Sequence, residues 1–292
     1  MFSVTGSSGF VGSSFLNYFK NEVIRISPRG NESNIDGDEV VIHLAGIAHD
    51  LKNTSRSQEY YDVNTELTKK VYDSFLASEA KVFITLSSVK AVADQVEGEL
   101  SEQHHPNPVT HYGKSKLLAE QYIFLKEIPE GKRVYVLRPC MIHGPGNKGN
   151  LNLLYKLVSK NIPWPLGALD NKRSFCSIDN LMFIFKELIE REDIPSGIYN
   201  IADDEPLSTN ELISLIAKSQ NRRPKFWSLS KKFIEGVASI GDKLHLPLNT
   251  ERLQKLTSSY VVNNAKIKAA IGKPLPVSSR DGLMKTFKSF KN

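Results

Sequence analysis

The chain has 292 residues, enough for one large core or two closely joined domains. Hydrophobic residues make up 40% and charged residues 24%, which is ordinary for a soluble globular protein, and no apolar run approaches the roughly 20 residues that span a bilayer. The N-terminus runs straight into a glycine-rich turn, without the basic and apolar regions of a signal peptide. Cys140 and Cys176 stand far apart in apolar surroundings, so we expect buried thiols, no disulfide and a cytoplasmic protein.

The net charge of +6 suits an anionic partner: a nucleic acid, a membrane surface or a small phosphorylated molecule. The densest basic clusters lie at 222–223, at 231–232 and in the tail 285–291. They lack the interleaved aromatic residues of a nucleic-acid platform, and the remaining positive charge is dispersed. We therefore expect no nucleic-acid partner and no stable membrane insertion, and we expect a few cations to be reserved for phosphates.

Short β-branched runs alternate with helical stretches along the first half of the chain. The predicted strands are 2–5, 23–26, 40–44, 82–87 and 134–138. The predicted helices between them are 11–20, 64–78 and 111–126. This βαβ alternation predicts an α/β fold, a doubly wound parallel sheet of the Rossmann type with helices on both faces.

The character of the sequence changes at the Pro/Gly-rich connection 144–149. We expect a dinucleotide-binding Rossmann domain at 1–145 and a smaller α+β substrate-binding domain at 146–292, of which about 174–203 packs back on the Rossmann half. Ser208 and Glu211 have the spacing of a capping box at the start of an amphipathic helix. A second amphipathic helix is predicted at 231–244, covering the domain rather than lying on a membrane.

A glycine-rich turn, Thr5-Gly6-Ser7-Ser8-Gly9-Phe10-Val11-Gly12, follows the first predicted strand. Gly6 permits a tight turn, Gly9 lets the backbone approach a pyrophosphate, and Gly12 permits close packing of helix on sheet. The start of the next helix offers free amides and a positive dipole to the anion. A purely structural glycine turn is the alternative, but the position in a βαβ pattern favours a dinucleotide site made by Gly6, Ser8, Gly9, Phe10, Val11 and Gly12.

The G-x-x-G-x-x-G spacing resembles the extended short-chain dehydrogenase/reductase family, in its nucleotide-sugar epimerase/dehydratase branch. The resemblance recurs along most of the chain, in the motifs His43-Leu44-Ala45-Gly46, Leu86-Ser87-Ser88-Val89, Tyr112-Gly113-Lys114-Ser115-Lys116 and Leu137-Arg138-Pro139. Asn64 falls at the position of the family's helix-opening asparagine. The resemblance implies further cofactor contacts from Leu44, Ala45, Gly46, Ser87, Tyr112, Lys116 and Pro139.

Tyr112 and Lys116 are spaced i and i+4, so both project from one face of the predicted helix. A free tyrosine titrates near pH ~10, too high for useful proton transfer at neutral pH, and a nearby ammonium draws its pKa down. The resemblance implies that Lys116 also holds the nicotinamide ribose and that Ser88 bonds the reacting sugar oxygen, with Ser87 as the alternative. We expect Ser88, Tyr112 and Lys116 to be catalytic. The histidines show no metal-ligand spacing, so we expect no metal.

The residues after Ser88 limit the reaction. The branch's 4,6-dehydratases carry an acid pair there, but this chain has Val89 and Lys90. No acid or base for dehydration is therefore evident. The stretch also lacks the cysteine of enzymes that combine 3,5-epimerisation with reduction. What remains is redox at C4 of the sugar, by a 4-ketoreductase or by a 4-epimerase that oxidises, rotates and re-reduces.

The end of the second predicted strand bears on the cofactor. An NAD enzyme usually has a carboxylate there, about 20 residues after the glycines, to bond the ribose 2′-OH. Here Ser27 and Arg29 occupy that region and could hold a 2′-phosphate, although a solvent-facing arginine is the alternative. We therefore favour NADP(H) over NAD(H). NADP(H) favours a net reductase, because an epimerase regenerates its own cofactor.

The stretches 87–90, 164–168 and 171–175 are similar to a subgroup from bacterial surface-polysaccharide pathways, whose members are often labelled UDP-glucose 4-epimerase. The resemblance implies a UDP-sugar substrate and reduction of a UDP-4-keto-6-deoxy-N-acetylhexosamine. A UDP-hexose or UDP-N-acetylhexosamine 4-epimerase with bound NAD is the alternative. Asn150 and Arg173 fall at family positions that meet the substrate diphosphate, and a second family arginine near the C-terminus has no match.

Two hypotheses from other classes are weaker. A non-catalytic Rossmann protein that senses a dinucleotide would not need the complete set of Ser88, Tyr112 and Lys116. A nucleic-acid or membrane-surface protein would need clustered basic charge, which the sequence does not show. Family members commonly dimerise through the helix that carries the catalytic tyrosine, so the resemblance also implies a homodimer.

Overall fold

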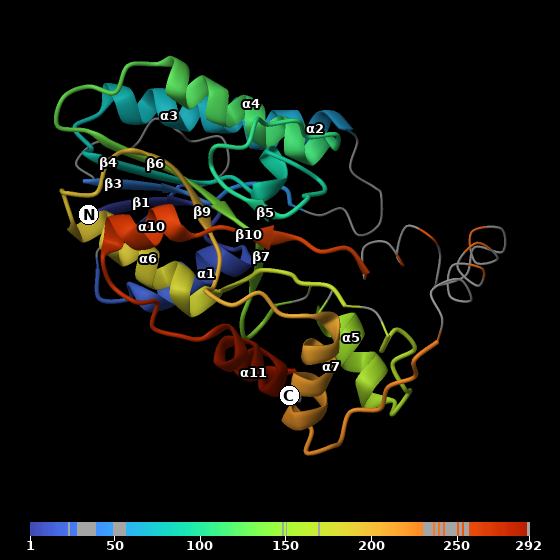
Figure 1. Cartoon of the computed structure of the whole chain (residues 1–292). Helices are drawn as coiled ribbons and strands as arrows, with labels where there is room; N and C mark the ends of the chain where they lie inside the picture. Colours follow the sequence, from blue (N-terminus) through green and yellow to red (C-terminus); the bar gives the residue numbers. More distant parts are fainter. Residues whose placement is uncertain are drawn as a thin grey trace.

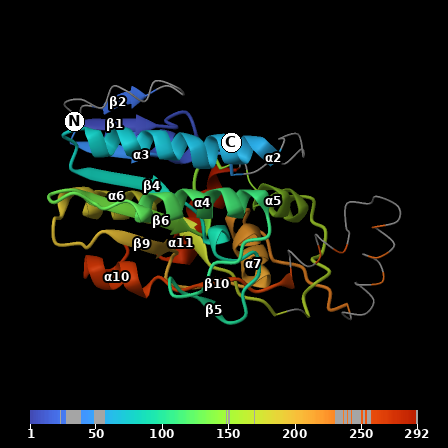
Figure 2. The same ribbon diagram turned by 90° about the horizontal axis from the view of Figure 1, so that it is seen from above.

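A six-stranded parallel sheet forms the centre of the structure (Figure 1). The computed structural model describes residues 1–22, 24–27, 39–48, 57–147, 149, 151–168, 170–229 and 257–290, together with residues 236, 239, 242, 250 and 253. The strand order is β2-β1-β3-β4-β6-β9, and Figure 2 shows it running from β2 at one edge to β9 at the other. The strands are Ile24–Ser27 (β2), Phe2–Thr5 (β1), Val40–His43 (β3), Val82–Leu86 (β4), Arg133–Pro139 (β6) and Gly197–Ile201 (β9).

Helices cover both faces of the sheet because successive strand residues point to opposite sides. Val40 and Ile42 face a core shared with α1, α6 and α10, whereas Val41 between them faces a core shared with α3 and α4. These two layers lie below and above the sheet in Figure 1. The helices are Phe10–Tyr18 (α1), Ile178–Glu190 (α6), Ala265–Ile271 (α10), Leu67–Ala77 (α3) and His111–Leu125 (α4). The arrangement confirms the predicted doubly wound sheet of the Rossmann type.

The strand order creates a crevice at one edge of the sheet. The chain places β2 on one side of β1 and β3 on the other, so the carboxyl ends of β1 and β3 form a topological switch point. Thr5 and His43 are register partners at these two ends. Ligands of open α/β sheets bind in such a crevice. A ligand is therefore expected at the turn after Thr5 and at the chain after His43.

Two predicted elements differ from the structure near this edge. The helix predicted from Asn64 begins earlier, as α2 (Ser57–Tyr61) followed by a π-helical turn (Asp62–Glu66) and α3. Asn64 therefore lies inside the helical run, and the expectation that it opens a helix is wrong. The strand predicted to reach Ser87 ends at Leu86, and Ser88 is the N-cap of a short 3-10 helix. π-Helical turns are rare and often occur at functional sites.

A second hydrophobic core lies among α5, α7 and α11 (Figure 1). These helices are Leu151–Ser159 (α5), Thr209–Ser219 (α7) and Ser279–Ser289 (α11). The capping box predicted for α7 is confirmed: Ser208 Oγ accepts from the Glu211 amide, and the Glu211 carboxylate accepts from the Ser208 amide. Two short parallel pairs, β7 (Met141–His143) with β8 (Phe175–Ser177) and β5 (Glu99–Leu100) with β10 (Val261–Val262), are the other strands of the described residues.

Residues 174–203 contribute to the large sheet as well as to the C-terminal half. They supply β9 as the edge strand and α6 to the core below the sheet. The amphipathic helix predicted at 231–244 lies mostly outside the described residues. Within the described part of the chain, no helix is both long enough and apolar enough to span a bilayer.

Candidate active site

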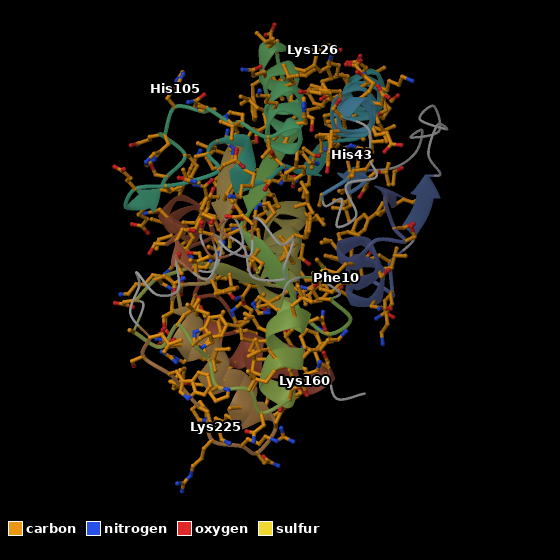
Figure 3. All side chains as sticks on the ribbon, turned by 90° about the vertical axis from the view of Figure 1, so that its right-hand side faces the viewer. Phe10, His43, His105, Lys126, Lys160 and Lys225 are labelled. Carbon is orange, nitrogen blue, oxygen red and sulfur yellow. The ribbon has the colours of Figure 1, made fainter. Side chains whose placement is uncertain are left out.

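The glycine turn after β1 lies directly against the chain that follows β3. Gly6 has a φ of +70°, and a Cβ on it would stand 2.4 Å from the amide nitrogen of Ala45. A Cβ on Gly12 would stand 2.2 Å from the carbonyl oxygen of Gly6. No side chain fits at either distance, so the turn requires glycine at both positions. Figure 3 looks onto this edge of the sheet, with His43 labelled above Phe10.

The N-terminus of α1 is open to an anion. Gly9 is its N-cap, no side chain caps the helix, and its first turn carries no acidic residue. Ser8 and Gly9 are exposed, whereas Phe10 and Val11 are partly buried. The unsatisfied amides and the helix dipole therefore face an accessible turn that suits a phosphate group.

A chain of hydrogen-bonded side chains crosses the sheet beside this turn. His43 Nδ1 lies 2.7 Å from Thr5 Oγ1, and His43 Nε2 lies 2.9 Å from Thr68 Oγ1. The Thr68 hydroxyl donates its own hydrogen to the Asn64 carbonyl oxygen, so Thr68 Oγ1 can only accept from His43. The imidazole therefore carries its hydrogen on Nε2, and the Thr5 hydroxyl donates to Nδ1. Burial, and next the Lys116 charge, lower the pKa of His43 to about 3, so this imidazole is neutral.

Asn64 connects this chain to the helix α4. Its Oδ1 accepts from the Ile47 amide at 2.9 Å, and its Nδ2 donates to the Ile47 carbonyl and to Ser115 Oγ, both at 3.0 Å. A Cβ on Gly46 would stand 3.1 Å from both Asn64 Oδ1 and Lys116 Nζ. The chain after β3 is thus fixed between the π-helical turn and Lys116.

Sequence reasoning gave no role to the side chains of Thr5 and His43. Their signal is positional: Thr5, His43 and Thr85 are buried polar residues and register partners on three neighbouring strands. Buried polar residues in a sheet core are hydrogen-bonded, and here their hydrogen bonds hold the chain that follows β1 and β3 in place.

Tyr112 and Ser88 meet where α4 packs against the 3-10 helix that follows β4. A Cβ on Gly113 would stand 2.4 Å from the Lys90 carbonyl oxygen, so glycine permits this close approach. Thr110 caps α4 by accepting from the Gly113 amide at 3.1 Å. Ser88 is buried, and its Oγ accepts from the Lys90 amide at 3.2 Å.

Burial raises the pKa of Tyr112 above its ordinary value of 10, and a hydrogen bond with Ser88 only partly opposes this. The sequence-based expectation that Lys116 lowers the pKa of Tyr112 is therefore not met. The physical reason is that the Lys116 ammonium is held by the Leu86 carbonyl oxygen, to which Nζ donates at 2.8 Å. The Tyr112 side chain is partly buried, and desolvation outweighs its hydrogen bond with Ser88.

Lys116 is itself a perturbed group. It is 7% exposed, and burial lowers its pKa to about 8. Glu120, one turn further on, raises this pKa, but Arg138 Nε already donates to the Glu120 carboxylate at 2.9 Å. The Lys116 ammonium thus lies at the switch point without an ion-pair partner in the described structure.

Ser87 and Pro139 lie at the same carboxyl edge. The Ser87 amide donates to the Leu137 carbonyl oxygen at 2.7 Å, while its buried Oγ has no partner among the described residues. Pro139 is the last residue of β6. A buried hydroxyl without a partner is costly unless something satisfies it. Ser87 is therefore available to a bound group.

Arg173 approaches this edge from the other half of the chain. Its backbone exchanges hydrogen bonds with Leu207, and Tyr260 flanks it in an isolated bridge. The Tyr260 hydroxyl donates to the Ala93 carbonyl oxygen at 2.7 Å, close after Ser88 in the chain. Burial lowers the pKa of the Arg173 guanidinium, which remains charged.

The position that follows Ser88 offers neither an acid nor a base for dehydration. Val89 is buried, while Lys90 Nζ donates to the Asp94 carbonyl oxygen at 2.7 Å and lies 4.3 Å from the centre of the Tyr260 ring. Burial raises the pKa of Cys140 well above its usual value, so this residue is a thiol. No cluster of three or more His, Cys, Asp or Glu side chains suited to a metal occurs in the described part of the chain.

Three predicted binding residues cannot be located in full. Arg29 and Asn150 lie outside the described residues. Ser27 is described as the last backbone position of β2, where it is the register partner of Thr5. Its place at the carboxyl edge beside the glycine turn follows from that register.

Comparisons with known proteins find sugar 4-epimerases and a sugar-nucleotide reductase among the relatives. A UDP-glucose 4-epimerase from Vibrio cholerae is 28% identical, over 98% of this chain and 94% of its own length. An N-acetyl-alpha-D-glucosaminyl-diphospho-ditrans,octacis-undecaprenol 4-epimerase from Escherichia coli O157:H7 is 28% identical, over 75% of this chain and 72% of its own length. A GDP-6-deoxy-D-mannose reductase from Pseudomonas aeruginosa is 24% identical, over 73% and 78% respectively.

Solved structures share the fold across the whole chain. UDP-N-acetylglucosamine 4-epimerase from Bacillus cereus superposes with a TM-score of 0.77 at 18% identity, covering 100% of this chain and 99% of its own. The model of the NAD dependent epimerase/dehydratase family matches residues 2–202, which include the glycine turn, the 43–46 segment and Ser88, Tyr112 and Lys116. The chain therefore belongs to the NAD-dependent epimerase/dehydratase family of enzymes.

Proposed function

We propose that this chain catalyses nicotinamide-dependent redox at C4 of a UDP-linked N-acetylhexosamine, in the direction that reduces a 4-keto-6-deoxy sugar with NADPH. The observation that carries the proposal is the convergence of Ser88, Tyr112 and Lys116 beside the glycine turn at the switch point. The relatives named as sugar 4-epimerases and as a GDP-sugar reductase support a nucleotide-linked sugar as the substrate.

The residues at the switch point fit a nicotinamide dinucleotide. The pyrophosphate cradle would be formed by Gly6, Ser8, Gly9, Phe10, Val11 and Gly12, and the remaining wall by Leu44, Ala45, Gly46 and Pro139. The buried Lys116 would hold the nicotinamide ribose, and the unpartnered Ser87 hydroxyl would satisfy a polar group of the bound cofactor. When bound, the cofactor supplies the hydride.

The protonation state of Tyr112 supports reduction. Reducing a ketone requires a proton donor at the carbonyl oxygen, whereas oxidising an alcohol requires a base. A tyrosine at its ordinary pKa near 10 is already protonated at neutral pH, and the upward shift keeps the Tyr112 hydroxyl so, which leaves it able to donate. Ser88 would bond the same sugar oxygen, and Arg173 with Asn150 would bind the substrate diphosphate. Val89 and Lys90 supply no group for dehydration.

The preference for NADPH rests on the end of β2. Ser27 and Arg29 stand where a carboxylate would repel a 2′-phosphate. A bond to a charged group contributes about 1.5–3 kcal/mol, so we expect NADPH to bind about tenfold to a hundredfold more tightly than NADH. Arg29→Ala should weaken NADPH and leave NADH nearly unchanged, and Ser27→Asp should reverse the preference. Calorimetric titration of both cofactors tests this, and equal or tighter NADH binding would remove the main argument for a reductase.

A 4-epimerase with bound NAD is the second candidate, because relatives bear that name. It needs Tyr112 to act as a base in the first half-reaction. Copurification of tightly bound NAD with the protein, together with turnover without added cofactor, would favour this candidate.

We also propose a homodimer through α4. On this helix Leu118 is 44% exposed and Leu125 is 84% exposed. The two residues are seven positions apart and so lie on one face of the helix. Covering these leucines would remove apolar area from water. Sedimentation equilibrium of the wild type and of Leu118→Lys/Leu125→Lys tests it, and a monomeric wild type would exclude it.

A further inference from the structure

Two segments of the C-terminal half, 159–167 and 222–228, lie side by side, and both carry exposed side chains. The Trp164 amide donates to the Lys225 carbonyl oxygen and the Trp227 amide to the Trp164 carbonyl oxygen, both at 2.8 Å. Arg222 Nη1 donates to the Ser159 carbonyl oxygen at 2.8 Å. Figure 3 shows Lys160 and Lys225 at the same end of the molecule. The basic-aromatic surface, as we name it, consists of the exposed residues Lys160, Ile162, Arg222, Arg223, Lys225, Phe226 and Trp227.

This surface lies in the part of the chain that has no acidic residues. The stretches 141–169 and 212–234 contain nine of the 38 Lys and Arg residues and none of the 32 Asp and Glu residues. Lys160, Arg223 and Lys225 form no ion pair within the described structure. The cluster at 222–223 was set aside for lack of interleaved aromatic residues, yet Phe226 and Trp227 follow it directly, and Lys160 is far from it along the chain. The fold brings them together.

The cations stand beside large apolar side chains that face water. Trp227 is 55% exposed, Ile162 49% and Phe226 38%. Leu153, on the helix α5 that ends at Ser159, is 67% exposed. A recess of about 490 Å³ opens between the cations, lined by Ser159, Asn161, Arg222, Arg223 and Lys225. A solvated basic surface needs none of these apolar groups.

We propose that the basic-aromatic surface docks the enzyme reversibly on an anionic lipid bilayer. Cations with exposed Trp, Phe and aliphatic residues are the pattern of interfacial membrane binding, in which ammonium and guanidinium groups meet headgroup phosphates and the apolar residues enter the interface. The recess between Arg222, Arg223 and Lys225 takes a headgroup phosphate. A free phosphate would use the recess but not Ile162, Phe226 or Trp227, and a nucleic acid would not use Ile162 or Leu153.

The binding experiment uses vesicle flotation and tryptophan fluorescence. Vesicles of phosphatidylcholine with 30% phosphatidylglycerol are compared with pure phosphatidylcholine, at low and at high NaCl. The chain has two tryptophans, of which Trp164 is 3% exposed, so a change in emission on binding reports Trp227. We expect the protein to float with the anionic vesicles alone, to shift its emission to the blue, and to dissociate as salt is raised.

Variants test which residues carry the binding. Lys160→Ala/Arg223→Ala/Lys225→Ala leaves the Arg222 hydrogen bond in place and should weaken vesicle binding about a hundredfold. A matched control removes the same charge elsewhere, with Lys20→Ala/Lys70→Ala/Lys81→Ala at exposed positions, and should bind within about threefold of wild type. Trp227→Ala should weaken binding about tenfold, whereas Trp227→Phe should bind almost normally without the blue shift.

Each remaining outcome overturns the proposal. One is a wild type that fails to float with anionic vesicles, and another is a control triple variant that loses as much binding as the test variant. A single-stranded oligonucleotide that displaces the protein from the vesicles would be the third such outcome. Self-association that buries Trp227 in the absence of lipid would assign the surface to a second copy instead. Circular dichroism melts of all variants establish that a loss of binding is not a loss of fold.

Discussion

Lys116 should cost the protein stability, and its replacement by methionine should make the fold more stable while it abolishes turnover. The side chain is 7% exposed, and burial lowers its pKa from 10.5 to about 8. A free energy of about 3 kcal/mol at neutral pH corresponds to that depression. Methionine has a similar length and no charge, but it loses the hydrogen bond from Nζ to the Leu86 carbonyl oxygen, worth about 1.5–3 kcal/mol because the donor is charged.

The net expectation for Lys116→Met is a gain of up to about 2 kcal/mol in unfolding free energy at pH 7, or up to about 4 °C in Tm. The pH dependence follows from the sign of the shift. The folded-state pKa lies below the unfolded one, so the cost is fully present below about pH 8 and falls as the pH rises toward 10.5. By pH 10 the advantage of the variant should have disappeared.

Urea denaturation of the cofactor-free protein at pH 7 and pH 10 measures this directly. Lys114→Met is the matched control, because Lys114 lies on the same helix and is exposed. It should change the stability by no more than a few tenths of a kcal/mol at either pH. A Lys116→Met variant less stable than wild type at pH 7, or an advantage that persists unchanged at pH 10, would refute the reasoning.

Three further substitutions probe the site. Tyr112→Phe should keep cofactor binding but lower kcat roughly a hundredfold or more, because the proton donor is lost; near-normal turnover would remove Tyr112 from the mechanism. Arg173→Ala should raise KM for the sugar nucleotide far more than KM for the cofactor, and the reverse in steady-state kinetics would assign Arg173 to the cofactor. Gly12→Ala should unfold readily or bind no cofactor, because its Cβ would stand 2.2 Å from the Gly6 carbonyl oxygen. Gly9→Ala, whose Cβ would stand 3.3 Å from the same oxygen, should fold normally, and equal melting temperatures of the two variants would contradict this.

Five strands of the large sheet could be predicted from the sequence, because they are short apolar runs with β-branched residues, whereas the edge strand β9 was not predicted. The runs 2–5 and 40–44 were predicted as strands, and the structure has strands at Phe2–Thr5 and Val40–His43. The π-helical turn around Asn64 could not be predicted, since it depends on bonds from the Asn64 side chain to Ile47 and Ser115, which are distant in sequence.

The electrostatics of the site needed the fold as well. The i, i+4 spacing predicted that Tyr112 and Lys116 share a helix face, but not that the Leu86 carbonyl oxygen holds the ammonium. Burial of both groups then acts on each pKa separately, raising that of Tyr112 and lowering that of Lys116. The gathering of Ser159 and Asn161 with Arg222 and Lys225 depends in the same way on two segments meeting in space.

The central claim is that the enzyme reduces a 4-keto sugar nucleotide. Incubating a UDP-4-keto-6-deoxy-N-acetylhexosamine with the protein and NADPH, and weighing the product by mass spectrometry, tests it most directly. The account predicts a product heavier by about two mass units, formed with NADPH oxidation and lost in Tyr112→Phe. An unchanged ketone, or interconversion of UDP-N-acetylhexosamine epimers at constant mass without added NADPH, would contradict it.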